Sequence, residues 1–289
     1  MTSLVPGEIM NAVQSAYGTV EKFSPAHGGC INNGGRLLTS SGEIFIKWNS
    51  ARKYPRMFEA ESYGLSQLAV HSPLRVPRVY DVIKTGEYQI LLLELILEKK
   101  RNTNYWYNLG EGLAATHKTT DATFGLLYDN YIGSLPQNNA KTDSLVEFYV
   151  KSRFMPQLEL ARQSDLLTKQ DGAMFEKLFT RLNEILPQQN PALLHGDLWS
   201  GNIMCDEQGQ PVLIDPAIYF GAPEADLAMT RLFGGFDTKF YEAYFAASEL
   251  PTGIEERIEI YQLYPLLVHV NLFGRSYASQ VREILSRFT

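Results

Sequence analysis

Three polar side chains surround a short apolar segment in the last third of the chain: Asp197, Asn202 and Asp215. Residues 203–205 and 211–214 are apolar, and the polar link between them contains a glycine. This pattern predicts two short strands joined as a hairpin. A hairpin brings its first and last residues together, so we expect Asn202 and Asp215 to face each other across the strand pair.

An amide oxygen close to two carboxylates is a ligand set that suits Mg²⁺, which completes its octahedron with water and phosphate. The H-x-D-x-x-x-x-N spacing of His195, Asp197 and Asn202 matches the catalytic loop of kinases. There the Asp receives the proton of the attacking hydroxyl, and a second metal-binding Asp follows. The alternative is a surface hairpin with a polar approach loop. His195 before the loop and Asp215 behind the hairpin favour the catalytic interpretation.

A candidate lysine–glutamate pair lies in the first third of the chain. Residues 44–48 form an apolar strand pattern that contains Lys47, as in the V-A-I-K strand whose lysine reaches the α and β phosphates. The alternative is an exposed lysine at the end of a strand. Helical spacing over 57–70 places Glu61 within the apolar stripe, while Glu59 points away. A core-facing carboxylate needs a cationic partner, so we expect Lys47 to pair with Glu61.

The segments H-G-D-L-W-S-G-N at 195–202 and D-P-A at 215–217 resemble the fructosamine kinase (ketosamine-3-kinase) family. That family belongs with the aminoglycoside and choline kinases on a protein-kinase-like fold, and the resemblance covers nearly the whole chain. It implies ATP and Mg²⁺ as cofactors and phosphorylation of a ketosamine at the O3 hydroxyl. In this interpretation Asp197 is the catalytic base, and Asn202 and Asp215 bind the metal.

Further nucleotide contacts are expected from a glycine-rich loop and from the hinge after residues 88–95. The loop at 27–35 would cover the phosphates, although clusters of Gly and Asn are often ordinary turns. A loop thiol could act as a redox sensor, but an inert small residue is the simpler expectation. The predicted contacts are Gly28, Gly29, Cys30, Glu94, Leu95 and Leu97, in addition to Lys47 and Glu61.

Two further residues near the motif have open alternatives. Trp199 is either a core residue or an apolar wall for a sugar ring, and its small neighbours and the family resemblance favour the wall. Asp226 either caps a helix near its start or accepts hydrogen bonds from the catalytic-loop backbone. Both roles of Asp226 are structural. His269 is expected to be a core or surface residue rather than a catalytic one.

The fold class expected is α/β (α+β), a two-lobed protein-kinase-like fold. Residues 1–97 would form a nucleotide-binding lobe with a five-stranded antiparallel sheet, and residues 98–289 a mainly helical catalytic and acceptor-binding lobe. The predicted strands are 20–23, 36–39, 44–48, 76–83 and 88–95. The predicted helices are 1–17, 57–70, 109–117, 144–161, 168–186 and a helical tail over about 254–286.

Bulk properties narrow the class of protein. The 289 residues are 45% hydrophobic and 20% charged with a net charge of −6, so a nucleic-acid partner is not expected. No apolar run reaches about 18 residues, which predicts no membrane span. The first residues lack the pattern of a signal peptide, and the 2 cysteines form no disulfide framework. We therefore expect a cytoplasmic protein, with a monomer as the default.

Two other functions stay open at this point. One is a kinase for a different hydroxyl acceptor, such as an amino sugar (as in aminoglycosides) or choline, and overall charge does not discriminate between these acceptors. The other is a non-catalytic nucleotide-binding regulator. The regulator is disfavoured because all five catalytic positions are filled: Lys47, Glu61, Asp197, Asn202 and Asp215.

Overall fold

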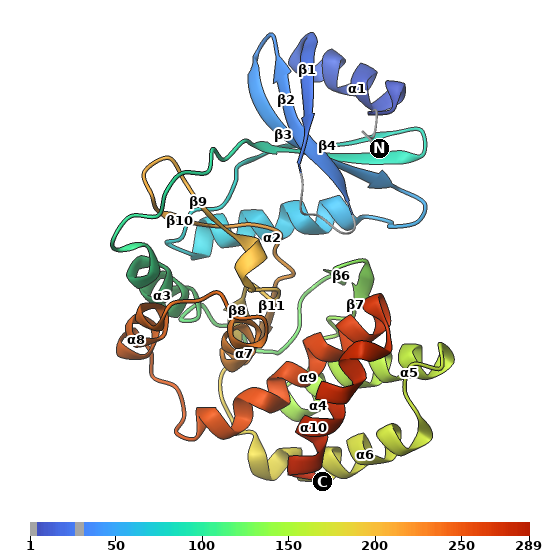
Figure 1. The fold of residues 1–289 in the computed structure, drawn as a ribbon, viewed down its shortest axis with the longest axis vertical. Coiled ribbons are helices and arrows are strands. Elements are labelled where there is room, and N and C mark those ends of the chain that lie inside the picture. Colours follow the sequence, from blue (N-terminus) through green and yellow to red (C-terminus); the bar gives the residue numbers. More distant parts are fainter. Residues whose placement is uncertain (1–4, 27–31) are drawn as a thin grey trace. The chain divides into compact units, whose positions relative to one another are not determined.

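The computed structural model describes residues 5–26 and 32–289. The chain forms two compact units, and each consists of two separate stretches of sequence (Figure 1). The first unit combines Met1–Tyr105 with Ile203–Asp215, and the second combines Trp106–Asn202 with Pro216–Thr289. In the described part of the chain no helix is long and apolar enough to cross a membrane.

The first unit contains the predicted five-stranded antiparallel sheet, in the order β1-β2-β3-β5-β4. Its strands are β1 Val20–Pro25, β2 Asn33–Thr39, β3 Gly42–Ser50, β4 Val79–Thr85 and β5 Tyr88–Glu94. Two tight turns connect neighbouring strands, because Thr39 pairs with Gly42 and Thr85 pairs with Tyr88. The positive φ of Gly86, 52°, suits the second turn.

Among the described residues of this unit the helices are α1 Gly7–Tyr17 and α2 Met57–His71. Ile9 and Val13 of α1 are buried and belong to one apolar cluster with residues of β2, β3 and β5. The nearly continuous apolar run of β5 is buried from Gln89 to Leu93, as expected for a strand between two others. The buried centre of the sheet therefore consists of β3 and β5.

The predicted hairpin is also confirmed. Strand β9, Ile203–Cys205, pairs antiparallel with β10, Pro211–Leu213, and Ile203 lies opposite Leu213. The hairpin groups with the first unit although most of that unit precedes Tyr105. Asp215 follows β10 by two residues and therefore belongs to the first unit.

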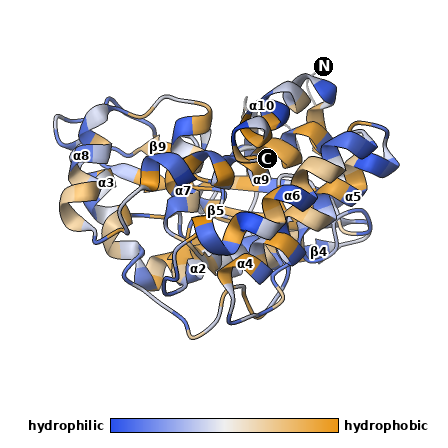
Figure 2. Cartoon of the chain, turned by 90° about the horizontal axis from the view of Figure 1, so that it is seen from below, coloured by the Kyte–Doolittle hydropathy of each residue, from blue (hydrophilic) through white to orange (hydrophobic). Residues whose placement is uncertain are grey.

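The second unit is mainly helical, as predicted. Its helices are α3 Tyr105–Thr116, α4 Leu145–Phe148, α5 Met155–Gln163, α6 Lys169–Ile185, α7 Glu224–Leu232, α8 Thr238–Ala247, α9 Ile254–Phe273 and α10 Ala278–Phe288. Its short strands are β6 Asn130–Ile132, β7 Leu135–Gln137, β8 Ala192–Leu194 and β11 Tyr219–Gly221. Most of these helices carry one hydrophobic and one hydrophilic face (Figure 2). Helix α9 is buried along most of its length, which makes it the core of the unit.

One helix prediction was wrong in detail. The helix expected over 144–161 is interrupted by a π-helix, Tyr149–Phe154, between α4 and α5. Arg153 is fully buried there, with its guanidinium 4.4 Å from the ring centre of Phe148 and 4.0 Å from that of Tyr219. The π-helix shifts the register of the following turn and so allows this inward position. The helical tail predicted over about 254–286 is confirmed, and it consists of α9 and α10 because Gly274, with φ of 96°, ends α9.

The start of α6 offers a test of the electrostatics of the second unit. Asp171 accepts hydrogen bonds from Thr168 in a capping box and from Arg282 of α10 at 2.7 and 3.0 Å. The hydrogen bonds from Arg282 are the largest influence on Asp171 and lower its pKa. Burial acts in the opposite direction, but the hydrogen bonds from Thr168 add to the effect of Arg282, and the pKa falls to about 2. The ionised Asp171 therefore stabilises the folded protein. This stabilisation is fully present above the pKa of an unfolded Asp, about 3.9, and is lost as the pH falls through about 2.

Asp171→Asn is expected to lower the free energy of unfolding at pH 7 by about 1–2 kcal/mol, because Arg282 is half exposed. Urea unfolding followed by circular dichroism, at several pH values between 7 and 3, measures the difference from the unsubstituted protein. We expect that difference to shrink below about pH 4. Glu147→Gln, at an exposed ion pair with Lys151, is the control. A difference that stays constant with pH would contradict the assignment.

Candidate active site

The catalytic-loop candidates lie directly after β8 in the second unit. The side-chain nitrogen of Asn202 donates to the backbone oxygen of Asp197 at 2.8 Å and to its carboxylate Oδ2 at 3.0 Å. The loop can turn here because Gly196 has a φ of 82°, and a Cβ at this position would lie 2.1 Å from the backbone oxygen of Ala217. The loop therefore fixes the Asp197 carboxylate against the amide of Asn202.

The loop backbone is held by the buried carboxylate of Asp226 on α7. Asp226 accepts from the backbone nitrogens of His195 at 2.8 Å and Gly196 at 2.9 Å, and from Nε2 of His117 at 3.1 Å. Burial opposes the charge, but His117 and the other donors outweigh it and keep the pKa of Asp226 below its ordinary value. The structure thus decides between the two alternatives for Asp226: its carboxylate is the buried acceptor for the backbone of the predicted catalytic loop.

Sequence reasoning missed His117, whose position at the end of a predicted helix hid its role. His117 is buried, and its Nδ1 lies 2.7 Å from the hydroxyl of Tyr244. A histidine near Asp226 in the fold but 109 positions away in the sequence gives no local signal.

In the first unit the predicted Lys47–Glu61 pair is present. Nζ of Lys47 on β3 donates to Oε1 of Glu61 on α2 at 2.7 Å, and it also reaches Oδ1 of Asp215 at 2.5 Å. Burial disfavours the charged ammonium, but the two carboxylates outweigh it and raise the pKa of Lys47 above its ordinary value. Glu59, which the helical spacing pointed away from the apolar stripe, forms an ion pair with Lys84 instead. Lys47 is therefore a buried cation held between two carboxylates.

Asp215 has an unusual backbone conformation. Its φ is 54°, in the left-handed region that few residues other than glycine adopt. The side chain is 45% exposed although one carboxylate oxygen is bonded to the buried Lys47. A strained, half-exposed carboxylate on a buried lysine is typical of functional sites.

Trp199 is not a core residue, since 37% of it is exposed. Its ring lies over Gly201, where a Cβ would come within 2.3 Å of the indole, and forms an edge contact with Phe233 at 6.3 Å. Phe233 in turn contacts His269, with 4.6 Å between the ring centres. His269 is held by the backbone oxygen of Pro265 at 2.8 Å, in keeping with a structural role. Part of the Trp199 side chain is therefore exposed to solvent.

The remaining predicted contacts are placed as follows. The side chain of Glu94, at the end of β5, is bonded to Arg75 and to the backbone nitrogen of Arg78. Leu95 is partly buried and Leu97 is 46% exposed. Gly28, Gly29 and Cys30 lie outside the described residues. The other cysteine, Cys205, is a buried free thiol on β9.

Comparison with a solved structure shows the fold. The chain aligns with aminoglycoside phosphotransferase APH(4)-Ia at a TM-score of 0.64, over 98% of this chain and 99% of that one. Their sequence identity is 12%, so this likeness shows the fold alone. The fold is that of the protein-kinase-like phosphotransferases, as predicted.

The family follows from more similar proteins. A model of the fructosamine kinase family matches residues 4–289, and the chain belongs to this family. A Synechocystis protein assigned as a ketoamine kinase is 40% identical over 269 residues, 93% of this chain and 90% of that protein. The ketosamine-3-kinase of Mus musculus is 30% identical over 92% of this chain and 94% of its own length. A Thermobifida fusca structure, assigned as a fructosamine-3-kinase, covers 98% of both chains with a TM-score of 0.87 and 31% identity. The protein is therefore an ATP-dependent phosphotransferase.

Proposed function

We propose that the chain transfers the γ-phosphoryl group of ATP to the 3-hydroxyl of a ketosamine. The observation that carries this proposal is the loop in which the Asp197 carboxylate is fixed by Asn202 and by the Asp226-bound backbone. A carboxylate in this loop position orients the acceptor hydroxyl and receives its proton. Catalysis then rests on positioning and on charge neutralisation.

The first unit would hold the nucleotide. Lys47 would bind the α and β phosphates, because its ammonium stays charged and Glu61 fixes its direction. The adenine would bind the hinge backbone after β5. Within the described part of the chain, the backbone of residues 95–97 forms none of the backbone–backbone hydrogen bonds found outside helices and strands, which would leave it available to adenine. Gly28, Gly29 and Cys30 complete the predicted contacts. In this proposal residues 1–97 form the nucleotide-binding lobe and residues 98–289 the catalytic and acceptor-binding lobe.

Asn202 and Asp215 are the proposed Mg²⁺ ligands, and their donor chemistry fits a hard cation. The nitrogen of the Asn202 amide is committed to Asp197, which directs the amide oxygen to other partners. Asp215 shares one oxygen with Lys47 and is 45% exposed, so a second oxygen is accessible. When bound, Mg²⁺ would neutralise charge that develops on the phosphates.

The acceptor is inferred from family membership and from the exposed indole of Trp199. A sugar bound against this ring must direct one hydroxyl to Asp197, within about 3 Å. A ketosamine can present its 3-hydroxyl in this way while its amine substituent points away from the base. The related proteins named above carry ketoamine, ketosamine and fructosamine in their names. A cytoplasmic location, a monomeric state and the absence of a nucleic-acid partner stay predictions.

Trp199→Ala is expected to raise the KM for the ketosamine about tenfold, equal to roughly 1.4 kcal/mol, because the stacked ring face is lost. The KM for ATP should stay nearly the same. Steady-state kinetics with each substrate varied in turn gives both constants. Tyr80→Ala, which removes an exposed ring from the edge strand β4, is the control. An unchanged acceptor KM, or an equal rise for ATP, would contradict the role of Trp199.

The proposed activity is tested by ATP consumption with a panel of acceptors. The panel contains fructosyl-lysine, a simple fructose-amine, free fructose, an amino sugar and choline. We expect ATP- and Mg²⁺-dependent turnover with the two ketosamines and much weaker turnover with fructose. Turnover with choline or the amino sugar, and with neither ketosamine, would show that the proposed acceptor is wrong. ATP binding without turnover on any acceptor would favour a regulator.

A further inference from the structure

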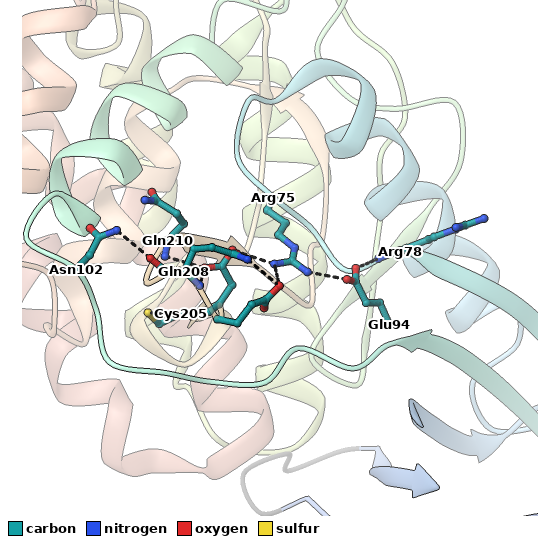
Figure 3. Close-up of polar contacts among 9 residues, drawn as sticks. Arg75, Arg78, Glu94, Asn102, Cys205, Gln208 and Gln210 are labelled. Carbon is teal, nitrogen blue, oxygen red and sulfur yellow. Dashed lines mark hydrogen bonds and ion pairs between the residues drawn. The ribbon is translucent and has the colours of Figure 1, made fainter. Parts of the chain in front are cut away.

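Arg75 connects three carboxylates of the first unit. It lies between α2 and β4, and its guanidinium bonds to Glu94 at 2.6 Å, Asp206 at 2.9 Å and Glu207 at 3.1 Å (Figure 3). Glu94 ends β5, whereas Asp206 and Glu207 form the turn between β9 and β10. One side chain therefore bridges the end of the central sheet and the hairpin that leads to Asp215.

The backbone of Arg75 holds the same hairpin at its other end. The backbone nitrogen of Leu213 donates to the backbone oxygen of Arg75 at 2.9 Å, and Arg75 forms a parallel bridge with Val212. Leu213 is only two residues before Asp215. Arg75 thus contacts the hairpin at its turn through the side chain and at its exit through the main chain.

The hairpin turn is built to receive this contact. Oδ1 of Asp206 accepts from the backbone nitrogens of Gln208 at 2.9 Å and Gln210 at 2.8 Å, while Oδ2 receives Arg75. Asp206 is 3% exposed, so its charge depends on these donors. Burial would raise the pKa of Asp206, but the two backbone donors and Arg75 lower it below its ordinary value. Loss of Arg75 would leave this carboxylate and Glu94 without their shared cation.

The segment after β5 joins the other side of the hairpin. The backbone nitrogen of Lys99 donates to Cys205 at 3.1 Å, and that of Asn102 donates to Gly209 at 3.1 Å. The side chain of Asn102 also reaches the backbone of Gln208 at 3.3 Å (Figure 3). A Cβ at Gly209 would lie 2.8 Å from the Asn102 nitrogen, so glycine permits this close approach. The β9–β10 hairpin is therefore fixed both to the five-stranded sheet and to the segment that follows β5.

We propose that Arg75 is a positioning residue for phosphoryl transfer: it fixes the β9–β10 hairpin so that Asp215 stays in register with Lys47. This inference rests on the proposed function, because it takes Asp215 as a metal ligand. A carboxylate displaced by about 1 Å loses much of its catalytic effect. The role of Arg75 is indirect, since its ion pairs within the described part of the chain are with Glu94, Asp206 and Glu207 rather than with a catalytic residue.

The test compares Arg75→Met, Arg75→Lys and the control Arg36→Met. Arg36 forms an exposed ion pair with Glu43 in the same sheet, so its loss reports the cost of removing an ordinary surface arginine. For each protein one measures kcat, both KM values, the Mg²⁺ concentration at half-maximal rate and the melting temperature. The acceptor is the ketosamine that the unsubstituted protein phosphorylates.

We expect Arg75→Met to lower kcat about 10- to 100-fold and to raise the Mg²⁺ requirement, with small changes in both KM values. Arg75→Lys should recover part of the loss, because one ammonium keeps the charge but does not bridge the carboxylates as a guanidinium does. Arg36→Met should match the unsubstituted protein. If Arg75→Met does not fold, the Mg²⁺ requirement of Arg75→Lys tests the proposal: a raised requirement supports it, and an unchanged one contradicts it.

Unchanged kcat and Mg²⁺ requirement in the folded Arg75 variants would overturn the proposal. A loss confined to either KM would also overturn it, because a displaced metal ligand acts on the transfer step. These outcomes differ from failure of the proposed function, in which the unsubstituted protein itself phosphorylates no ketosamine.

Discussion

Asp197→Asn is expected to lower kcat by about 10²–10⁴-fold and to leave the KM for ATP nearly unchanged. The amide keeps the size of the carboxylate and an oxygen that accepts from Asn202, so the loop geometry is retained. What is lost is the group that receives the proton of the acceptor hydroxyl. The effect should therefore appear in the transfer step and in neither substrate's affinity.

Single-turnover kinetics with saturating ATP and ketosamine measures this step directly. Asp237→Asn is a matched control, because Asp237 caps α8 and asparagine caps a helix equally well. A variant at position 197 with ordinary turnover would remove Asp197 from the catalytic role. An equal loss of ATP binding would show instead that the substitution disturbs the nucleotide site.

Asp215→Ala is expected to abolish activity at ordinary Mg²⁺ concentrations, with a loss of about 10²-fold or more. Two causes act together: a charged metal ligand is removed, and Lys47 loses one of its two carboxylate partners. Asn202→Ala should be milder, because a neutral ligand contributes less charge. Titration of Mg²⁺ against both variants measures the effect, and higher metal concentrations should restore part of the rate in Asn202→Ala.

The backbone strain at Asp215 needs its own control. Asp165 has almost the same φ, 55° against 54°, and lies outside the proposed site. Asp165→Ala therefore measures only the loss of stability that results from placing alanine at a positive φ. We expect this variant to be less stable but to have an unchanged Mg²⁺ requirement. Identical Mg²⁺ dependence in Asp215→Ala, Asn202→Ala and the unsubstituted protein would refute the metal assignment.

Local pattern predicted most of the first unit. Alternating and continuous apolar runs gave the five strands, and the stripe in α2 selected Glu61 over Glu59 as the partner of Lys47. These predictions succeed because periodicity records which side of an element faces the core. The same reasoning gave the β9–β10 hairpin and thus the placement of Asp215 after it.

Contacts between distant stretches of sequence were beyond the reach of pattern. Lys47 and Asp215 are 168 positions apart, and Arg75 and Asp206 are 131 apart. Arg75 stands in a loop between two prolines, where the sequence suggests only an exposed residue. Arg153 was missed for a similar reason: a charged residue in an amphipathic helix is normally on the surface, and only the π-helix turns it inward.

The central claim is tested most directly by the product of one reaction. A small fructose-amine is incubated with the protein, ATP and Mg²⁺, and the product is examined by mass spectrometry and by phosphorus–proton correlation in NMR. Phosphoryl transfer to the ketosamine predicts one added phosphate, bonded to O3 of the sugar. If no ketosamine gains a phosphate while choline or an amino sugar does, the assigned acceptor is wrong.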